Sequence, residues 1–96
     1  MSYIKILWKE ADEGLPSLYY SELDDNRWEL RKVEVYRDGL ATYADKDIST
    51  GSTMLGLIPF PPISELGARP ELDVEEISKE EFDEAWSKVV SSSTFK

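Results

Sequence analysis

The sequence predicts an α+β fold in which an antiparallel sheet of three to five strands packs against a C-terminal helix. Three observations predict this class. Ile4, Ile6 and Trp8 stand at every second position near the start of the chain, as in a β-strand. An Asp38-Gly39 pair joins two β-like segments, and an amphipathic helical pattern follows Ile77. Strands that precede a helix in this order are typical of proteins in which the helix covers one face of the sheet.

The first two strands are expected at residues 3–9 and 17–23. Ile4, Ile6 and Trp8 occupy alternate positions in the first strand, so these three side chains should share one sheet face. The polar segment between the two strands contains Gly and Pro, which predicts a surface loop. The second strand is rich in Leu and Tyr and ends at a run of turn-forming residues.

The clearest β signal is a hairpin around Asp38-Gly39. This pair favours a tight type I′ turn, or a three-residue loop in which Gly supplies the left-handed residue beside a bulge. With a two-residue loop, Val35 would face Thr42 and Val33 would face Ala44.

The apolar phase changes inside the first arm of this hairpin. Apolar side chains fall on the even positions Trp28 and Leu30, and then on the odd positions Val33 and Val35. A strand that keeps both pairs inward needs one extra residue, so we expect a β-bulge or a sharp bend near Arg31. The alternative is a sheet that is buried on both faces.

The segment between the hairpin and the final helix should be mostly irregular. Residues 45–53 are polar and predict a surface loop, and residues 54–58 could form a further strand. Pro62 is suited to begin a short helical turn that Gly67 closes. Residues 68–76 are acidic and are expected to be irregular.

The last element has the best-defined start. Ser78 and Glu81 form a capping box, and Ile77 before the cap can pack on Phe82. Five apolar side chains then fall on one helical stripe: Phe82, Ala85, Trp86, Val89 and Val90. We expect this stripe to cover the sheet, residues 91–96 to fray, and residues 1–96 to form a single domain.

Composition excludes much catalytic chemistry. The chain of 96 residues has no Cys and no His, which excludes thiol nucleophiles, Cys/His zinc sites and imidazole proton shuttles. We therefore expect no enzyme, no catalytic residue, no cofactor and no metal; an enzyme that uses carboxylates alone is a minor alternative. An apolar stretch over residues 54–60 is far too short to span a bilayer, so we expect a cytoplasmic protein with no membrane partner.

The charge balance indicates what kind of partner would fit. Eleven basic against twenty acidic residues give a net charge of −9, which opposes direct binding to nucleic acid and favours a basic protein partner. Residues 71–84 contain eight carboxylates and one lysine. The five carboxylates chosen as a candidate partner-binding surface are Glu71, Asp73, Glu75, Glu76 and Glu80. A solvated helix start, in which acids complement the helix dipole, is the structural alternative.

Aromatic residues and Arg dominate binding hot spots, so Tyr19 and Tyr20, expected as exposed anchors, and Arg27 complete the candidate partner-binding set. Each tyrosine could equally be a core residue, and Trp28 is a further candidate for which a place in the core is favoured. The other basic residues of the hairpin alternate with acids, which indicates either a charged recognition face or ordinary cross-strand ion pairing.

Three sequence runs resemble a family of small acidic bacterial proteins carried as a domain of unknown function. These runs are Tyr20 to Gly39, Pro61-Pro62-Ile63 and Glu76 to Phe82, and the likeness covers about residues 3 to 90. The resemblance implies one compact bacterial domain and supplies no catalytic residue.

The functional hypothesis from the sequence is a small inhibitor, monomeric or dimeric, that occludes a basic partner. An immunity protein against a toxin nuclease, or a phage-type inhibitor that mimics nucleic-acid charge, would fit. The alternative is a bacterial housekeeping or stress module with no dedicated partner.

Overall fold

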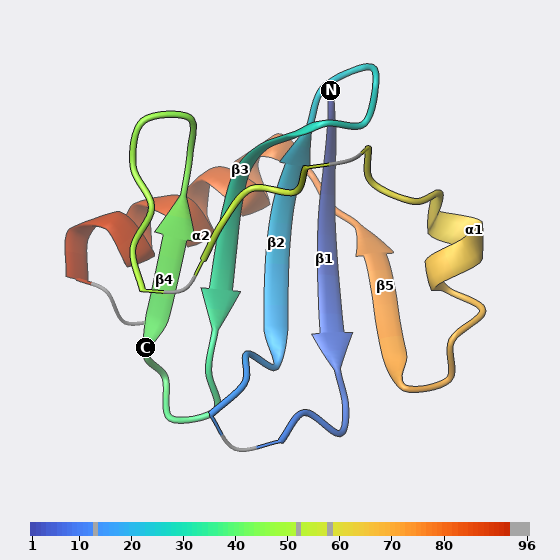
Figure 1. Ribbon diagram of the computed structural model, residues 1–96, viewed down its shortest axis with the longest axis horizontal. Coiled ribbons are helices and arrows are strands. Elements are labelled where there is room, and N and C mark those ends of the chain that lie inside the picture. Colours follow the sequence, from blue (N-terminus) through green and yellow to red (C-terminus); the bar gives the residue numbers. More distant parts are fainter. Residues whose placement is uncertain (13, 52, 58, 93–96) are drawn as a thin grey trace.

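The computed structural model describes the chain except for residues 13, 52, 58 and 93–96 (Figure 1). Its elements, in chain order, are β1 (Ser2–Trp8), β2 (Leu18–Leu23), β3 (Glu29–Val35), β4 (Ala41–Ala44), α1 (Ile63–Leu66), β5 (Leu72–Glu76) and α2 (Lys79–Ser92). This content confirms the α+β class.

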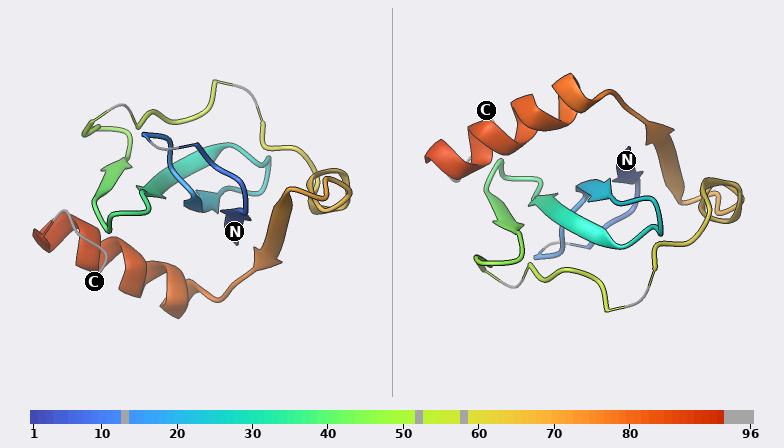
Figure 2. Two further views of the ribbon diagram at one scale, coloured as in Figure 1. Left: turned by 90° about the horizontal axis from the view of Figure 1, so that it is seen from below. Right: turned by 90° about the horizontal axis from the view of Figure 1, so that it is seen from above.

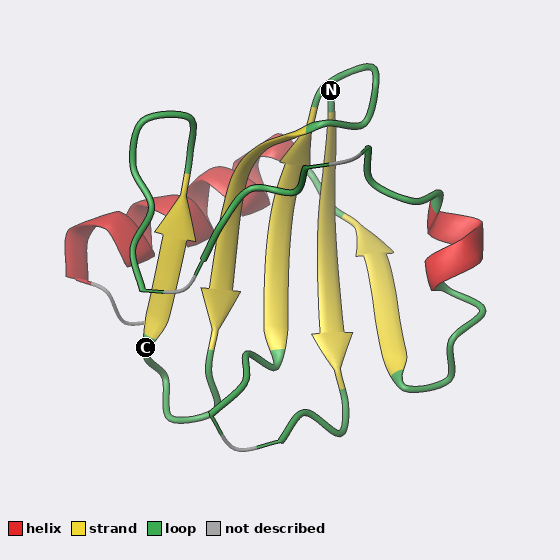
Figure 3. Cartoon of the chain, viewed as in Figure 1, coloured by secondary structure: helices red, strands yellow, loops and turns green. Residues whose placement is uncertain are grey.

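The five strands form one antiparallel sheet in the order β4-β3-β2-β1-β5. Strands β1 to β4 follow one another as a meander, and the chain then crosses the sheet to place β5 on the free side of β1 (Figure 3). We call residues 45–71, which join β4 to β5, the crossover segment. Helix α2 returns across the opposite face, so the sheet lies between α2 and the crossover segment (Figure 2). In the described part of the chain, no helix is long and apolar enough to cross a bilayer.

Both faces of the sheet are buried, which was the stated alternative to a one-sided sheet. One cluster joins the sheet to α2 and contains Tyr3, Tyr20, Val33, Val35, Ala41, Ile77, Phe82, Ala85 and Val89. On the other face, Ile4, Ile6 and Leu23 pack against α1 and the residues that flank it. Tyr3 and Ile4 follow each other in β1 and point to opposite faces, so β1 contributes to both clusters.

The β3–β4 hairpin has the three-residue loop, and the register expected for a two-residue loop is wrong by one residue. Val35 faces Ala41 and Val33 faces Tyr43. The Tyr36 N–H donates to the Leu40 carbonyl at 2.8 Å, and Gly39 has a φ of 91°. Gly39 therefore supplies the left-handed residue of the loop, as the second of the two expected turn forms requires.

A bulge lies next to Arg31, as the change of apolar phase predicted. Glu22 pairs with Arg31 and Leu23 pairs with Glu29, so Leu30 is the extra residue of β3. The bulge does not bring Trp28 into the core: its side chain is 42% exposed, whereas Glu29 is buried. The expectation that the even-numbered apolar residues join the core is therefore wrong for Trp28.

The crossover segment differs from the sequence expectation at two points. Met54 to Leu57 form no strand, and Ile58 lies outside the described residues. The short helix after Pro62 is present as α1. The acidic segment 68–76 was expected to be irregular, but its second half is β5, because Leu72 and Val74 pack against the apolar cluster that contains Ile4 and Ile6.

Helix α2 begins as expected. The Ser78 hydroxyl accepts a hydrogen bond from the Glu81 N–H at 3.1 Å, and Ile77 and Phe82 are both buried in the same cluster. Val90 is the exception on the stripe, since its side chain is exposed. Ser91 and Ser92 belong to the helix rather than to a frayed tail, and the rest of the expected tail lies outside the described residues.

Candidate partner-binding surface

The five carboxylates chosen from the sequence come together at one edge of the sheet. β5 is the last strand beyond β1, and only Ile77 and Ser78 separate it from α2. We call the surface that these five residues form the acidic edge: Glu71 just before β5, Asp73, Glu75 and Glu76 within it, and Glu80 in the first turn of α2.

The acidic edge wraps around β5 and does not form one flat patch. Asp73 and Glu75 face Leu7 and Lys5 of β1, on the side of the sheet that α2 covers. Glu76 pairs with Ile4 and so points to the opposite side. A partner that contacts all of these carboxylates must therefore reach both sides of the edge strand.

Two of the five carboxylates already have cationic partners. Asp73 lies 3.2 Å from Lys9, and Glu71 lies 2.7 Å from Arg69. A hydrogen bond from its own backbone N–H and then the Arg69 guanidinium lower the pKa of the Glu71 carboxyl. Both groups are thus partly neutralised within the molecule.

The other three carboxylates, Glu75, Glu76 and Glu80, make no ion pair with any residue that the structure describes. All three residues are exposed. The uncompensated negative charge of the acidic edge is therefore concentrated on the end of β5 and the start of α2.

The next acids along α2 are engaged within the protein. Glu81 lies 3.9 Å from Lys5, and Glu84 lies 3.7 Å from Lys88. Asp83 contacts Lys79 at 2.6 Å and Arg31 at 3.0 Å. Hydrogen bonds from Lys79 first, and then from Arg31, lower the pKa of the Asp83 carboxyl.

The two tyrosines do not lie on the acidic edge. Tyr20 is only 4% exposed and belongs to the cluster under α2, so its expected place as an exposed anchor is wrong. Burial is the main cause that raises the pKa of its phenol. Tyr19 lies on the other face, half-buried, and its hydroxyl donates to the Pro16 carbonyl at 3.1 Å.

Arg27 joins the crossover segment to the β2–β3 turn through hydrogen bonds. Its Nε donates to the Phe60 carbonyl at 3.0 Å and its Nη2 donates to the Pro61 carbonyl at 2.7 Å. In return, the Arg27 carbonyl accepts the Phe60 N–H at 2.7 Å. The guanidinium is thus engaged inside the protein, which is a structural role that the sequence analysis missed.

Two basic residues of the hairpin, Arg31 and Lys32, form ion pairs, as the simpler of the two interpretations predicted, whereas Arg37 forms none with a described residue. Arg31 binds Glu22 through Nε at 2.7 Å, and Lys32 lies 3.0 Å from the buried Glu29. The Arg31 guanidinium also lies 4.8 Å from the centre of the Phe82 ring and 5.1 Å from that of Trp86. These contacts join β3 to α2.

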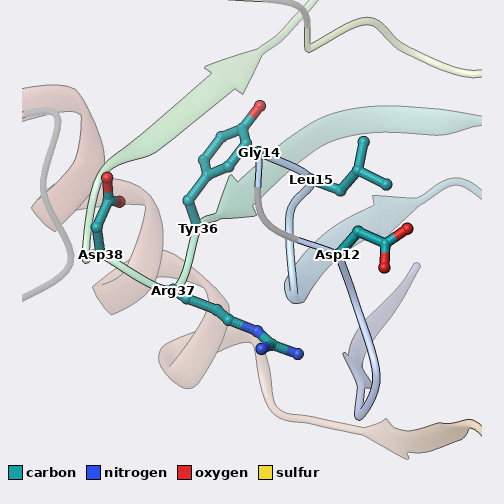
Figure 4. A pocket seen from close by; sticks show the side chains of 6 residues that line it. All are labelled: Asp12, Gly14, Leu15, Tyr36, Arg37 and Asp38. Atoms are coloured by element: carbon teal, nitrogen blue, oxygen red, sulfur yellow. The ribbon is translucent and has the colours of Figure 1, made fainter.

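A separate hollow lies between the β1–β2 loop and the β3–β4 turn (Figure 4). We call it the loop pocket; its volume is about 340 Å³ and its lining residues are Asp12, Gly14, Leu15, Tyr36, Arg37 and Asp38. The sequence analysis missed it because its two walls are distant in sequence. In a meander, alternate connections lie at the same end of the sheet, so the predicted strand order could have indicated that the β1–β2 loop and the β3–β4 turn are neighbours.

Among the residues that the structure describes, no group of three or more acidic side chains is arranged to hold a metal ion. Fold and surface together define a small antiparallel α+β protein with an acidic edge strand. The chain belongs to the family described as Domain of unknown function (DUF6881), whose sequence pattern matches residues 2–91. No curated protein and no solved structure shows significant similarity to the chain.

Proposed function

We propose that this protein is a small, acidic, non-catalytic inhibitor that binds a basic protein in the cytoplasm and occludes its cationic surface. An immunity protein against a toxin nuclease, or an inhibitor that mimics nucleic-acid charge, is the kind of protein that this proposal describes. The observation that carries it is the group of three exposed carboxylates, Glu75, Glu76 and Glu80, which have no ion-pair partner within the described residues.

Electrostatics supports this choice of partner. A net charge of −9 attracts a cationic surface over a distance of about one Debye length, roughly 8 Å at physiological salt. Uncompensated charges on the rim of an interface chiefly raise the rate of association and suppress wrong partners. The acidic edge is suited to this task because its free carboxylates are already exposed and need not be released from internal ion pairs.

The position of Glu75 and Glu76 on the edge strand β5 has a second consequence. An edge strand presents unpaired backbone groups, and charged side chains on it discourage pairing with a second copy of the same chain. Like charges on β5 would oppose one another in such a pair. A basic partner removes this repulsion, whereas a second acidic copy adds to it.

The proposal can be tested by using the protein as bait in an extract of its native host. We would compare the parent chain with the variant Glu75→Lys, Glu76→Lys, Glu80→Lys and with a matched control, Glu10→Lys, Asp47→Lys, Glu65→Lys. The control acids are also exposed and without ion pairs in the described part of the structure, so both variants change the net charge equally.

We expect the parent and the control to retain the same basic protein, and the acidic-edge variant to lose it. Equal loss of the partner by both variants would mean that net charge alone governs capture, and full retention by both would mean that the acidic edge is not the binding surface. If no bait retains a basic protein, the alternative of a module without a dedicated partner is the better account.

A further inference from the structure

Exposed apolar side chains gather where the crossover segment passes the β2–β3 turn. Trp28 is 42% exposed and Leu57 is 83% exposed. Leu30 and Leu55, each two residues away from one of them along the chain, are half-buried. We call these four residues the apolar patch. Exposed apolar groups that lie together and are bordered by polar residues mark interaction sites.

Hydrogen bonds on both sides of Trp28 hold the crossover segment beside it. The Arg27 carbonyl accepts the Phe60 N–H at 2.7 Å. The Glu29 carboxylate, which is buried, accepts the Gly56 N–H at 2.6 Å. Because Trp28 lies between these two anchoring residues, the two segments of the apolar patch are held together by groups that do not belong to it.

A hollow of about 280 Å³ adjoins the apolar patch, since Leu30 and Leu55 form part of its wall. Charged residues form the rest of the wall: Glu29, Arg31, Asp45, Lys46 and Asp47. Small-molecule sites occupy roughly 300–1,000 Å³, so a hollow of this volume suits a single inserted side chain better than a separate ligand. Exposed Trp next to an apolar hollow with a charged rim is the composition of a protein-binding hot spot.

The uncompensated charge at the rim of this hollow is acidic. Glu29 and Arg31 are already engaged in ion pairs within the protein. Asp45, Lys46 and Asp47 make no ion pair with any residue that the structure describes, which leaves two carboxylates against one ammonium group. The net charge of −9 adds to this excess and disfavours a second copy of the chain as the occupant. The complementary occupant is therefore an apolar side chain bordered by cations.

We propose that the basic partner inserts an aromatic side chain, flanked by arginines, between the apolar patch and the turn after β4. This inference rests on the proposed function and adds the part of the partner that is recognised. The apolar patch and the acidic edge lie at the same end of the sheet, because β3 begins where β5 ends (Figure 1), so one partner can meet both. The acidic edge would govern the rate of association, and the inserted side chain would slow dissociation.

The probe is the peptide acetyl-Arg-Phe-Arg-amide, titrated into the isotopically labelled chain while its signals are followed by NMR. Acetyl-Arg-Ser-Arg-amide lacks the aromatic side chain, and acetyl-Glu-Phe-Glu-amide reverses the flanking charge. The variants are Trp28→Ala and the matched control Leu40→Ala, which removes an exposed apolar side chain from the β3–β4 loop. The capture experiment changes the acidic edge and uses no peptide, so the two proposals can fail separately.

We expect saturable shifts of the Trp28 indole N–H and of the Leu30 and Leu55 amides with acetyl-Arg-Phe-Arg-amide. Binding should be about tenfold weaker for each control peptide and for Trp28→Ala, and unchanged for Leu40→Ala. The proposal is overturned if the probe gives no saturable shift at these residues, if either control peptide binds as well, or if Trp28→Ala binds as the parent does. The peptides are compared on the parent chain, so this result does not depend on the folding of a variant.

Sedimentation of the parent chain and of Trp28→Ala tests the other occupant. We expect both to be monomers. A dimer of the parent that Trp28→Ala abolishes would assign the apolar patch to a second copy of the chain and would overturn the proposal.

Discussion

Arg27 has a left-handed backbone conformation although it carries a full side chain. Its φ is 66°, a value that is uncommon outside glycine. Three hydrogen bonds to Phe60 and Pro61 hold the residue there and fix the crossover segment to the turn after β2. Local strain that persists in this way has to be offset by surrounding contacts.

Arg27→Ala should therefore destabilise the protein by about 2 kcal/mol, because it removes two hydrogen bonds from a charged donor. Arg27→Gly loses the same bonds but relieves the backbone strain, so it should be less destabilising than Arg27→Ala. Denaturant midpoints of the three proteins give the ranking. If both variants had the same denaturant midpoint as the parent, the Arg27 hydrogen bonds to the crossover segment would contribute nothing to stability.

Gly39 shows how far a single residue can be predicted. The Asp38-Gly39 pair correctly indicated a turn and a positive φ at Gly39, but it did not decide between the two-residue and the three-residue loop. Both loops place Gly in an allowed conformation. The register of β4 against β3 depends on the loop length, so it could not be predicted from the turn residues alone.

Gly39→Val should destabilise the protein by about 1–2 kcal/mol, because a β-branched side chain is strained at a φ of 91°. Gly39→Asn is the matched control, since Asn tolerates left-handed backbone, and it should cost less. Thermal unfolding of the two variants measures the difference, and equal midpoints would contradict the loop assignment.

Glu22 is the carboxylate whose protonation should matter most for stability. Hydrogen bonds from Arg31 at 2.7 and 2.8 Å lower the pKa of Glu22 below its usual value of 4.5, against the opposing effect of burial. The stabilisation is present above that usual value. It is lost as the pH falls through the lower pKa of the folded state.

Glu22→Gln should accordingly lose less stability than the parent when the pH is lowered below about 4.5. Asp83 and Glu71 also have lowered pKa values, so the acid sensitivity should be reduced rather than abolished. Chemical denaturation at neutral and acid pH measures the effect. A Glu10→Gln control, which alters an exposed residue, should follow the parent; parallel curves for Glu22→Gln and the parent would refute the linkage.

Helix α2 was predictable from its own residues, whereas β5 was not. The capping box, the Ile77–Phe82 contact and the apolar stripe are all local signals. β5 has only Leu72 and Val74 between acids, and it is a strand because β1 supplies its hydrogen-bonding partner and the second core cluster buries those two side chains. Such tertiary support leaves little trace in a segment of this length.

The packing of α2 predicts an order of mutational effects. Phe82 is fully buried, whereas Trp86 is only partly buried beside Tyr43 and Arg31. Phe82→Ala should cost about 3–5 kcal/mol, Trp86→Ala less, and Ser78→Ala about 1 kcal/mol. Equilibrium unfolding in denaturant tests this order, which fails if Trp86→Ala proves the most damaging of the three.

For the molecule as a whole, the sequence predicted the layers better than the surface. A sheet with α2 on one face followed from the order of the elements. The change of apolar phase near Arg31 predicted the bulge, and burial of both faces was its stated alternative; the structure has both. Exposure of individual aromatic residues did not follow. Tyr20 is buried because it lies on the sheet face that α2 covers, and Trp28, just before β3, remains exposed.

The acidic edge could be predicted as a group because its members are close in sequence. Their pairing could not be predicted, since Lys9 reaches Asp73 only through the register of β1 with β5. Which carboxylates remain uncompensated is thus a property of the whole sheet. Glu75, Glu76 and Glu80 are the three on which the proposed function depends.

The most direct test is the association rate constant of the captured partner, measured across a range of ionic strength. The proteins compared are the parent, the variant Glu75→Lys, Glu76→Lys, Glu80→Lys, and the control Glu10→Lys, Asp47→Lys, Glu65→Lys. We predict fast association that slows steeply with added salt for the parent and the control, and slow association with little salt dependence for the acidic-edge variant. If the acidic-edge variant associates with the same rate and the same salt dependence as the parent, the acidic edge is not the surface that meets the partner.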